Sequence, residues 1–385
     1  MNTHAAAPRV LLIGTFETKR QELAYFAAAL RAHELDVELL DVSLDSKGAI
    51  WSGAEKLAQM AARAQAAAAK ITDHCVDCQV AIGVGGGTGG EIVLAAIKGL
   101  PQTFPKILIT TLAFDPRPAL ADSSITIIPT LCDIEGMNTQ LRQVFENAAA
   151  GVAGLVRARR VEKAEKQTVA LTTLGATGLA GSQIARALTD IGFEPTVFHA
   201  NGYGGAAFAR FVSEGHADAI IDMNVHELGR IRLAGAHVMM PQRFTAGADL
   251  PRVVLPGALN FLGLGAPETI PDTYLERPHY RHTNQFTHVK LTSDEMVSQA
   301  TELATLLNRL PDCHVILPMG GFSHEDRVGG AIEDEGLRTI AAELIETAAK
   351  SYTVQRLPHH INDPRTATAA VDALHSALTK RNTHV

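Results

Sequence analysis

The sequence is short of cysteine, of charged residues and of long apolar runs. Only four cysteines occur among 385 residues, which excludes a disulfide-built scaffold and favours a reducing compartment. Charged residues make up 19 % and hydrophobic residues 46 %, a balance that excludes a disordered chain. Every apolar run stays well short of the ~18 residues that a membrane span needs, and residues 1–10 do not have the pattern of a signal peptide. We therefore expect a cytoplasmic protein without a membrane partner.

Positive charge is scarce as well. The 34 Lys and Arg residues are outnumbered by 41 Asp and Glu residues, so the formal net charge is −7. A chain of this charge has no overall attraction to nucleic acid, and we predict no nucleic-acid partner. Its one strongly charged segment, 157–167, interleaves Glu162 and Glu165 with basic residues. This segment predicts a solvated link between two domains, 1–165 and 166–385.

What the chain has is a repeated alternation of short apolar strands and longer helical segments. Such alternation is typical of parallel sheets covered by helices on both faces. The predicted fold class is α/β, with two Rossmann-like doubly wound domains and mainly parallel sheets. Ligands of such sheets bind at the carboxyl ends of the strands, so we expect an interdomain cleft. The predicted strands are 10–13, 37–42, 80–84, 106–112, 124–128, 168–173, 195–200, 219–222, 252–256, 287–290, 314–318 and 353–356.

One region has no clear period. Residues 261–285 contain Pro, Gly, His and Tyr without helical or strand alternation. Loops of this length are usually functional or disordered, and this one is too rich in apolar and aromatic groups for disorder. We expect a loop that covers the cleft.

A glycine-rich turn is the strongest local motif. Residues 83–90 contain six glycines, directly after a predicted strand and before a predicted helix. Bare backbone and a helix amino end favour an anion such as phosphate, whereas the alternative is a tight turn without a ligand. No GlyLysSer/Thr ending makes it a Walker A loop, and Thr110 stands where a dinucleotide site has an acidic residue. The predicted phosphate-binding residues are Gly85, Gly86, Gly87, Thr88 and Gly89.

A second polar turn, 14–19, follows the first strand. Thr15, Thr18 and Lys19 offer hydroxyls and a cation to a phosphate, and Glu17 offers a carboxylate to Mg²⁺ or a ribose hydroxyl. An equally weighted alternative has a threonine as helix cap and the lysine in solvent.

The second half has three polar turns at strand ends, 173–178, 199–205 and 318–330. Together they predict the rim of a second ligand pocket for a small acidic metabolite. The candidate substrate-binding residues are Gly202, Gly204, Gly205, Asn284 and Ser323.

Five residues of this half are candidate acids, bases or metal ligands. No HisGluXXHis spacing connects them, so no metal site is predicted. The Cys75–Cys78 pair has no second CysXXCys and is interpreted as two partly buried thiols, and no serine lies in a G-x-S-x-G elbow. The candidates are His199, Glu227, His282, His324 and Asp326.

Taken in order, the motifs resemble one known family. The chain is similar to the ATP-binding domain family of the tomato mosaic virus resistance protein from about residue 10 to about 349. This resemblance implies two Rossmann-like subdomains, self-association, and ATP with Mg²⁺, whose phosphates would meet the glycine loop with Thr15, Thr18 and Lys19 nearby. The segments that carry the resemblance are 14–19, 85–90, 132–138, 199–205, 256–261, 280–284 and 318–326.

Three departures from the family pattern favour a branch with its own ligand. Glu17 stands where the family has Asp, and segments 110–117 and 331–337 differ from the usual sequences.

Three functions follow as hypotheses. The first is a nucleotide-binding protein that forms a homodimer or larger homo-oligomer. The second is a lyase, hydrolase or isomerase acting on a small carboxylated or phosphorylated metabolite, with His199, Glu227 and His282 transferring protons. The third is a regulatory binding module whose ligand controls a partner.

Overall fold

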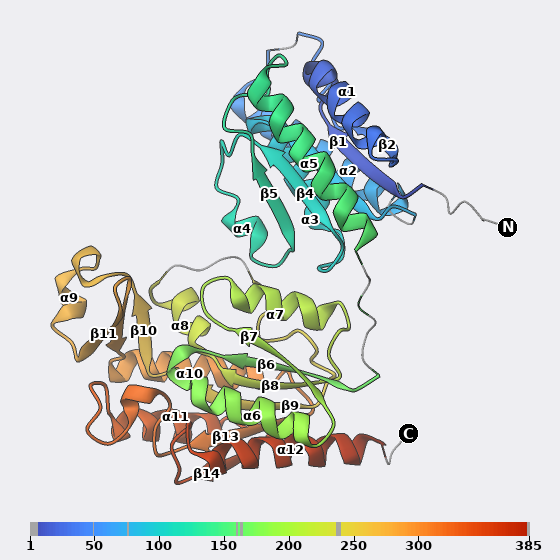
Figure 1. The fold of residues 1–385 in the computed structure, drawn as a ribbon. Coiled ribbons are helices and arrows are strands. Elements are labelled where there is room, and N and C mark those ends of the chain that lie inside the picture. Colours follow the sequence, from blue (N-terminus) through green and yellow to red (C-terminus); the bar gives the residue numbers. More distant parts are fainter. Residues whose placement is uncertain are drawn as a thin grey trace. The chain divides into compact units, whose positions relative to one another are not determined.

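The computed structural model describes residues 7–48, 50–74, 77–158, 161, 165–235 and 240–382. The chain separates into two compact units, Met1–Glu162 and Lys163–Val385 (Figure 1). Residues 159, 160 and 162–164 of the predicted link, Glu162 among them, lie outside the described residues, as does Cys75 of the predicted thiol pair.

The N-terminal unit contains a five-stranded parallel sheet in the order β2-β1-β3-β4-β5. This is a doubly wound order, in which the order of the strands reverses between β1 and β3. Ligands of such sheets bind at the carboxyl edge beside that reversal. The strands are β1 (Arg9–Gly14), β2 (Asp36–Asp41), β3 (Val80–Gly85), β4 (Lys106–Thr110) and β5 (Ile125–Pro129).

Helices cover both faces of this sheet, which explains why its strands are apolar without alternation. In β1, Val10 and Leu12 pack toward α1 and α5, and Leu11 and Ile13 pack toward α2 and α3. Figure 1 shows α1 and α5 side by side on one face. The helices are α1 (Phe16–Ala32), α2 (Gly53–His74), α3 (Gly87–Lys98), the short α4 (Arg117–Leu120) and α5 (Thr139–Arg157).

The C-terminal unit repeats the design with one strand more. Its parallel sheet has the order β7-β6-β8-β9-β13-β14, with the reversal between β6 and β8. The predicted α/β fold with two doubly wound, mainly parallel sheets is therefore confirmed. The strands are β6 (Thr168–Thr173), β7 (Glu194–His199), β8 (Ala219–Asn224), β9 (Arg252–Gly257), β13 (Cys313–Pro318) and β14 (Tyr352–Leu357).

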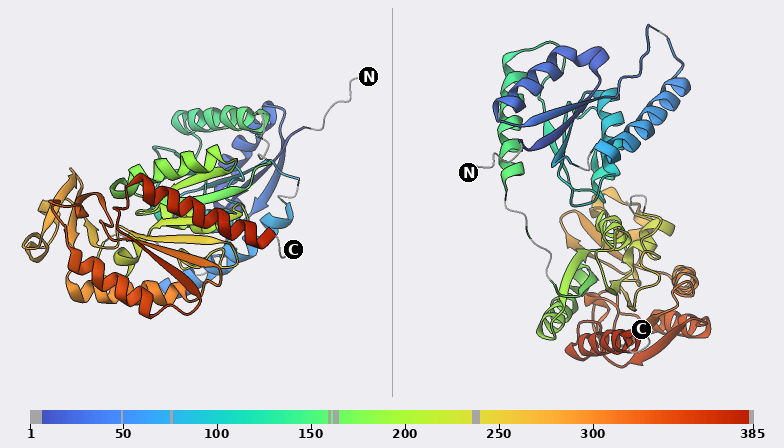
Figure 2. Two further views of the ribbon diagram at one scale, coloured as in Figure 1. Left: turned by 90° about the horizontal axis from the view of Figure 1, so that it is seen from below. Right: turned by 90° about the vertical axis from the view of Figure 1, so that its right-hand side faces the viewer.

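Helices cover both faces of this sheet, with α6 and α12 on one face and α7, α10 and α11 on the other. Val169 and Leu171 of β6 pack with α6 and α12, whereas Ala170 packs with α7. Figure 2 shows α6 and α12 side by side. The helices are α6 (Gly178–Asp190), α7 (Gly204–Ser213), α8 (His226–Arg232), α9 (Asp272–Leu275), α10 (Ser293–Leu307), α11 (Glu335–Thr347) and α12 (Pro364–Asn382), with 3-10 turns η1 (Gly175–Thr177), η2 (Pro267–Thr269) and η3 (His324–Asp326).

The prediction of a long loop over 261–285 is wrong. Two of its segments, β10 and β11, join the predicted strand 287–290 in a small antiparallel sheet of order β10-β12-β11, and the short helical turns η2 and α9 lie between them. Its strands escape sequence patterns because β10 is buried on both faces and β11 is largely exposed, so neither alternates. The sheet follows β9 and places its side chains at the carboxyl edge. The strands are β10 (Phe261–Leu264), β11 (His279–Thr283) and β12 (Phe286–Lys290).

None of the helices described combines the length and apolar character that crossing a bilayer requires. Cys78 is a buried free thiol, and burial raises its pKa, so it stays protonated.

Candidate functional site

The two polar turns of the N-terminal unit lie side by side. Strands β1 and β3 are parallel neighbours, with Gly14 opposite Val84 at their ends. A Cβ atom added to Gly89 would lie 3.3 Å from Cγ2 of Thr15. The turn after β1 and the glycine loop after β3 therefore share the carboxyl edge where the strand order reverses.

The glycines of the loop are of two kinds. At Gly85 a Cβ would overlap the backbone of Gly90, and at Gly90 it would lie 2.9 Å from the ring of Phe114. Packing alone therefore requires these two glycines. At Gly86 and Gly87 the nearest atoms would be 3.7 Å and 3.6 Å away, so packing does not explain why these positions lack side chains.

The bare positions lie where α3 begins. Gly86 is the N-cap and Gly87 the first helical residue, and no side chain caps the helix. The first N–H groups of a helix have no intrahelical acceptor, and this end carries a partial positive charge. An anion placed here would accept hydrogen bonds from Gly87, Thr88 and Gly89.

The loops after β4 and β5 complete this edge. The closest side-chain atoms to a Cβ on Gly86 are Oγ1 of Thr111, at 3.7 Å, and Oδ1 of Asp133, at 3.9 Å. Sequence reasoning did not single out either residue, although Thr111 directly follows β4 and Asp133 lies four residues after the end of β5. A carboxylate beside a phosphate site suits Mg²⁺. Since the described residues hold no group of three or more metal-binding side chains, phosphate oxygens and water would supply most of its ligands.

At the start of α1, the side chain in the N-cap position does not cap the helix. Thr15 occupies the N-cap position, but its hydroxyl makes no cap hydrogen bond and instead lies 3.1 Å from the hydroxyl of Thr18. Lys19 has non-helical angles, φ −126° and ψ 29°. Glu17 faces the segment after β2, where its backbone N–H donates to Oγ of Ser43 at 2.9 Å and its carboxylate accepts from Ser46.

In the C-terminal unit, hydrogen bonds connect the turns that follow β6, β13 and β14. The side chain of Asn362 accepts from the N–H of Ala180 and donates to the carbonyl of Ala176, each at 3.2 Å. Nε2 of His360 lies 2.9 Å from the carbonyl of Ser323. The predicted turns 173–178 and 318–330 are thus close together, both near the end of β14.

Glu227 is held in a buried ionic network. Its carboxylate accepts from the N–H of Gly205 at 2.9 Å and from Nε of Arg243 at 2.6 Å. Arg243 also donates to Asp222 at 2.9 Å, and both Arg243 and Glu227 are wholly buried. With both oxygens engaged, Glu227 is better suited to holding the turn 199–205 than to transferring protons.

Backbone conformation and contacts within the protein explain why three positions of that turn are glycine. Gly202 has a φ of +63°, which favours glycine. A Cβ on Gly204 would overlap the carbonyl of His199, and one on Gly205 would overlap the Glu227 carboxylate. These glycines therefore shape the turn, and their presence does not by itself require a substrate.

Asp326 anchors the turn after β13. Its carboxylate accepts from the N–H groups of Phe322 at 2.8 Å and Asp334 at 3.1 Å, and from Arg338 at 2.5 Å. Burial raises the pKa of Asp326 to about 6. His324, two residues earlier, is exposed and lies 3.4 Å from the carboxylate of Glu325.

A stack of rings forms the inner wall of this edge. His282, His288, Phe261 and His226 follow one another with ring centroids 4.5, 4.1 and 4.7 Å apart. Burial lowers the pKa of His226 to about 4 and that of His288 to about 2, so both rings are neutral at pH 7. The Tyr280 hydroxyl lies 2.7 Å from Nδ1 of His288. Only His282 was predicted. Tyr280 lies two residues before it on the same strand, and His288 pairs with Tyr280 across the β11–β12 ladder.

The stack reaches the turn after β6. A Cβ on Gly175 would lie 3.3 Å from Nε2 of His282. Beside it, a groove of about 380 Å³ is lined by Thr173, Gly178, Ser182 and His199, among others. The predicted residues His199 and His282 thus border the same turn, whereas Asn284 lies exposed between β11 and β12.

Several buried polar atoms at this edge have no hydrogen-bond partner among the described residues. They are Nδ2 of Asn224, Nε2 of His226, both side-chain polar atoms of Asn260, and Oγ of Ser323. An orphaned buried group costs about 1–3 kcal/mol, and such groups are rare in native proteins.

These orphaned atoms come from adjoining turns. The N–H of His226 donates to Oδ1 of Asn224 at 2.9 Å, and its Nδ1 lies 3.2 Å from the carbonyl of Ala258. The N–H of Ala258 donates to the carbonyl of Phe322 at 2.9 Å. Ala258 itself has a left-handed φ of +55°, a conformation in which strain often accompanies function.

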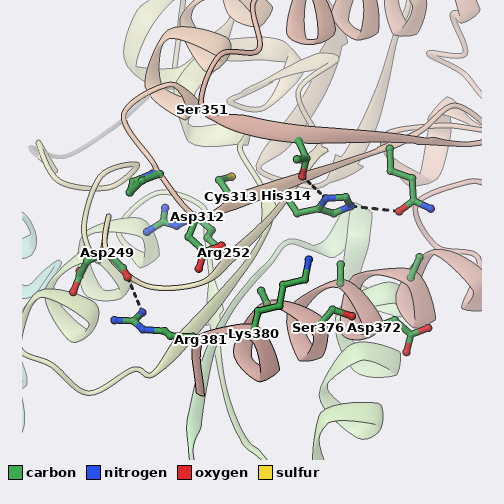
Figure 3. Close-up of a pocket in the computed structure, with 16 residues that line it drawn as sticks. Asp249, Arg252, Asp312, Cys313, His314, Ser351, Asp372, Ser376, Lys380 and Arg381 are labelled. Atoms are coloured by element: carbon green, nitrogen blue, oxygen red, sulfur yellow. Dashed lines mark hydrogen bonds between the residues drawn. The ribbon is translucent and has the colours of Figure 1, made fainter. Parts of the chain in front are cut away.

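A larger hollow, of about 880 Å³, lies at the opposite end of this sheet. Figure 3 shows it between α12 and the amino ends of β9, β13 and β14. Several of its polar groups are paired, as where His314 contacts Thr353 at 2.7 Å and Arg381 donates to the carbonyl of Asp249 at 2.7 Å. Because doubly wound sheets bind ligands at the carboxyl edge, we place the candidate sites there.

Fold and sites together define a protein of two doubly wound α/β units, each with a polar carboxyl edge. The chain belongs to the UPF0261 family, an uncharacterised protein family. The N-terminal domain of that family matches residues 52–161 and its C-terminal domain matches residues 166–378.

Relatives extend over nearly the whole chain. A UPF0261 protein of Mesorhizobium japonicum is 32 % identical, covering 94 % of this chain and 97 % of its own length. One from Clostridium tetani is 27 % identical over 97 % and 99 %. The ToMV resistance protein Tm-1(GCR237) of Solanum lycopersicum is 31 % identical over 76 % of this chain but only 40 % of that protein.

Proposed function

We propose that the N-terminal unit binds the phosphates of a nucleotide, ATP with Mg²⁺ in the first place, at the amino end of α3. One observation carries the proposal: Gly86 and Gly87 lack side chains although a Cβ would meet nothing closer than 3.6 Å. They begin a helix without a side-chain cap, at the edge where the strand order reverses. The resemblance to an ATP-binding domain family supports the same ligand.

The residues around the loop suit a magnesium–nucleotide complex. The N–H groups of the first turn of α3 would donate to phosphate oxygens, and the hydroxyls of Thr15 and Thr111 would supply further donors. Lys19 offers the cation. Asp133 and Glu17 are the carboxylates for Mg²⁺ or its waters, and the ion would neutralise phosphate charge.

Thermal unfolding tests this proposal. A ligand present at ~100 times its dissociation constant stabilises a protein by roughly 2.7 kcal/mol, which is visible as a raised midpoint. We expect such a rise with ATP and Mg²⁺, and smaller ones with AMP, phosphate or citrate.

Gly87→Asp and Gly87→Asn form a matched pair of variants. Both side chains fit, because Gly87 is helical and its Cβ would lie 3.6 Å from Ala113. A carboxylate at a helix amino end also favours folding. Gly87→Asp should therefore fold well but repel phosphate, whereas the neutral isostere should keep most of the ligand-induced rise. A full rise with Gly87→Asp would contradict a phosphate site here.

A second function, binding of a small hydroxylated or carboxylated metabolite, is favoured by the orphaned atoms of the C-terminal unit. Asn260 and Ser323 supply unpaired polar atoms there, and the Tyr280–His288 pair and His282 would serve a proton-transfer enzyme.

The Asn260→Leu variant tests whether this edge binds such a metabolite. If the amide serves a ligand, the apo protein should unfold no earlier than wild type, because an orphaned group is removed, and stabilisation by small acids should vanish. Early unfolding without ligand would instead indicate that water satisfies Asn260.

A further inference from the structure

Two leucines on neighbouring strands of the N-terminal unit share an unusual conformation. The last paired residues of β4 and β5 are Thr110 and Pro129, and the N–H of Thr130 continues the ladder to the Thr110 carbonyl at 3.1 Å. Counting two residues beyond the pair on each strand gives Leu112 and Leu131. Both have left-handed backbones, with φ of +56° and +59°.

Folding of the unit does not explain this pair. A left-handed backbone costs a residue with a Cβ roughly 1–2 kcal/mol, and leucine repays such a cost only by burial. Yet Leu112 is 44 % exposed and Leu131 is 85 % exposed. Strain of this kind in non-glycine residues clusters at binding sites.

The pair borders the glycine loop. Leu112 stands between Thr111 and Ala113, the residues nearest to side chains added at Gly86 and Gly87. Leu131 lies two residues before Asp133, whose Oδ1 would be 3.9 Å from a Cβ added to Gly86. Two strained residues with exposed apolar side chains therefore belong to the loops whose other residues face the proposed phosphate site.

We propose that Leu112 and Leu131 form an apolar platform for the base of the nucleotide whose phosphates bind at α3. The proposal rests on the proposed function and adds to it the part of the ligand that is recognised beyond its phosphates. A base is planar and largely apolar on its faces, so it gains from covering two leucines that water otherwise contacts. The phosphates alone would have no use for this platform.

Binding of Mg²⁺–ATP and Mg²⁺–tripolyphosphate, measured by calorimetry on the full chain, separates the two contributions. Wild type should bind ATP at least about tenfold more tightly, a difference of roughly 1.4 kcal/mol. The double variant Leu112→Asn, Leu131→Asn should lose this preference and keep its affinity for tripolyphosphate. Asparagine tolerates a left-handed backbone, so the variant should fold at least as stably. Leu57→Gln, at a 64 % exposed leucine on α2, is the matched control and should change neither affinity.

The other possible results contradict either the platform or the proposed function. Equal binding of the two ligands by wild type would overturn the platform and leave the phosphate site standing. An ATP preference that survives in the double variant would also overturn it. If neither ligand binds, the proposed function fails first. A changed oligomeric state with unchanged ATP binding would show that the leucines contact another copy of the chain, and would overturn the proposal as well.

Discussion

The carboxyl edges of the two sheets present different chemical groups, backbone in one unit and side chains in the other. In the N-terminal unit the edge beside α3 is bare backbone, with Gly86 and Gly87 open and hydroxyls at its margin. In the C-terminal unit the same topological position carries side chains, namely stacked histidine rings and buried amides. Backbone N–H groups at a helix end select negative charge, whereas neutral buried rings and amides select shape and hydrogen bonding. One type of sheet order thus presents two chemically different edges.

The two edges also differ in how deeply their charged side chains are buried. The C-terminal edge depends on a wholly buried network of Asp222, Arg243 and Glu227. At the N-terminal edge, the carboxylate of Asp41 lies near the surface of the unit. Burial works to raise its pKa, but hydrogen bonds from Ser43 and Phe16 outweigh this and lower the pKa below its usual range. Disrupting the buried network should therefore have the largest effect.

Arg243→Met should destabilise the C-terminal unit by about 3–5 kcal/mol, because it leaves two buried carboxylates without their partner. Urea unfolding followed by circular dichroism should show an early transition of one unit. Arg117→Met removes an exposed partner of Asp115 and should leave the curve unchanged. Equal behaviour of the two variants would show that the buried network does not support the C-terminal edge.

Acidification should weaken the C-terminal unit through its buried histidines. The folded pKa of His226, about 4, lies below its ordinary value of 6.5, because burial disfavours the charged ring. The unfolded chain therefore takes up the proton first, so the stabilisation is complete above pH 6.5 and is lost as the pH falls toward 4. The loss should reach roughly 3 kcal/mol for this ring.

His226→Gln removes this titration and keeps a donor for the Ala258 carbonyl. Unfolding midpoints measured from pH 7 to pH 4 should fall less steeply in this variant than in wild type. His324→Gln, at an exposed ring, should follow wild type. Parallel profiles for all three proteins would contradict a neutral, buried His226.

The glycine loop should respond in opposite directions at two neighbouring positions. Gly85→Ala should destabilise the N-terminal unit by about 1–3 kcal/mol, because the new Cβ meets the backbone of Gly90. Gly87→Ala should stabilise it by roughly 0.5–1 kcal/mol, because alanine is the better helix former and has room. Thermal unfolding without ligand measures both. A loss of stability in both variants would mean that Gly87 is also required by packing.

How far the sequence predicts these edges depends on the range of the interactions. The strands are apolar without alternation because helices cover both faces of each sheet, and this local pattern sufficed to predict the fold class. The glycine loop could be placed at a strand end for the same reason. The region 261–285 could not, since its short strands are either wholly buried or largely exposed and show no alternation.

The site residues divide along the same line. His282 was singled out on its loop position, but its stacking on His288 depends on the β11–β12 pairing. Glu227 was singled out as an acid or base, and only the position of Arg243 shows that both its oxygens are engaged. Residue type indicates what a group can do, whereas its contacts decide whether it is free to act.

By itself, the sequence determined two doubly wound α/β units and a helix that begins at a run of glycines, since apolar periodicity and glycine act over a few neighbouring residues. Tertiary structure decided which glycines are open, which carboxylates are paired and which polar atoms are orphaned. It also brought the loops that hold Leu112 and Leu131 to the ends of neighbouring strands, because the pairing of β4 with β5 joins segments that no sequence pattern connects. Contacts between such segments, set by strand pairing and burial, are the part that local patterns cannot encode.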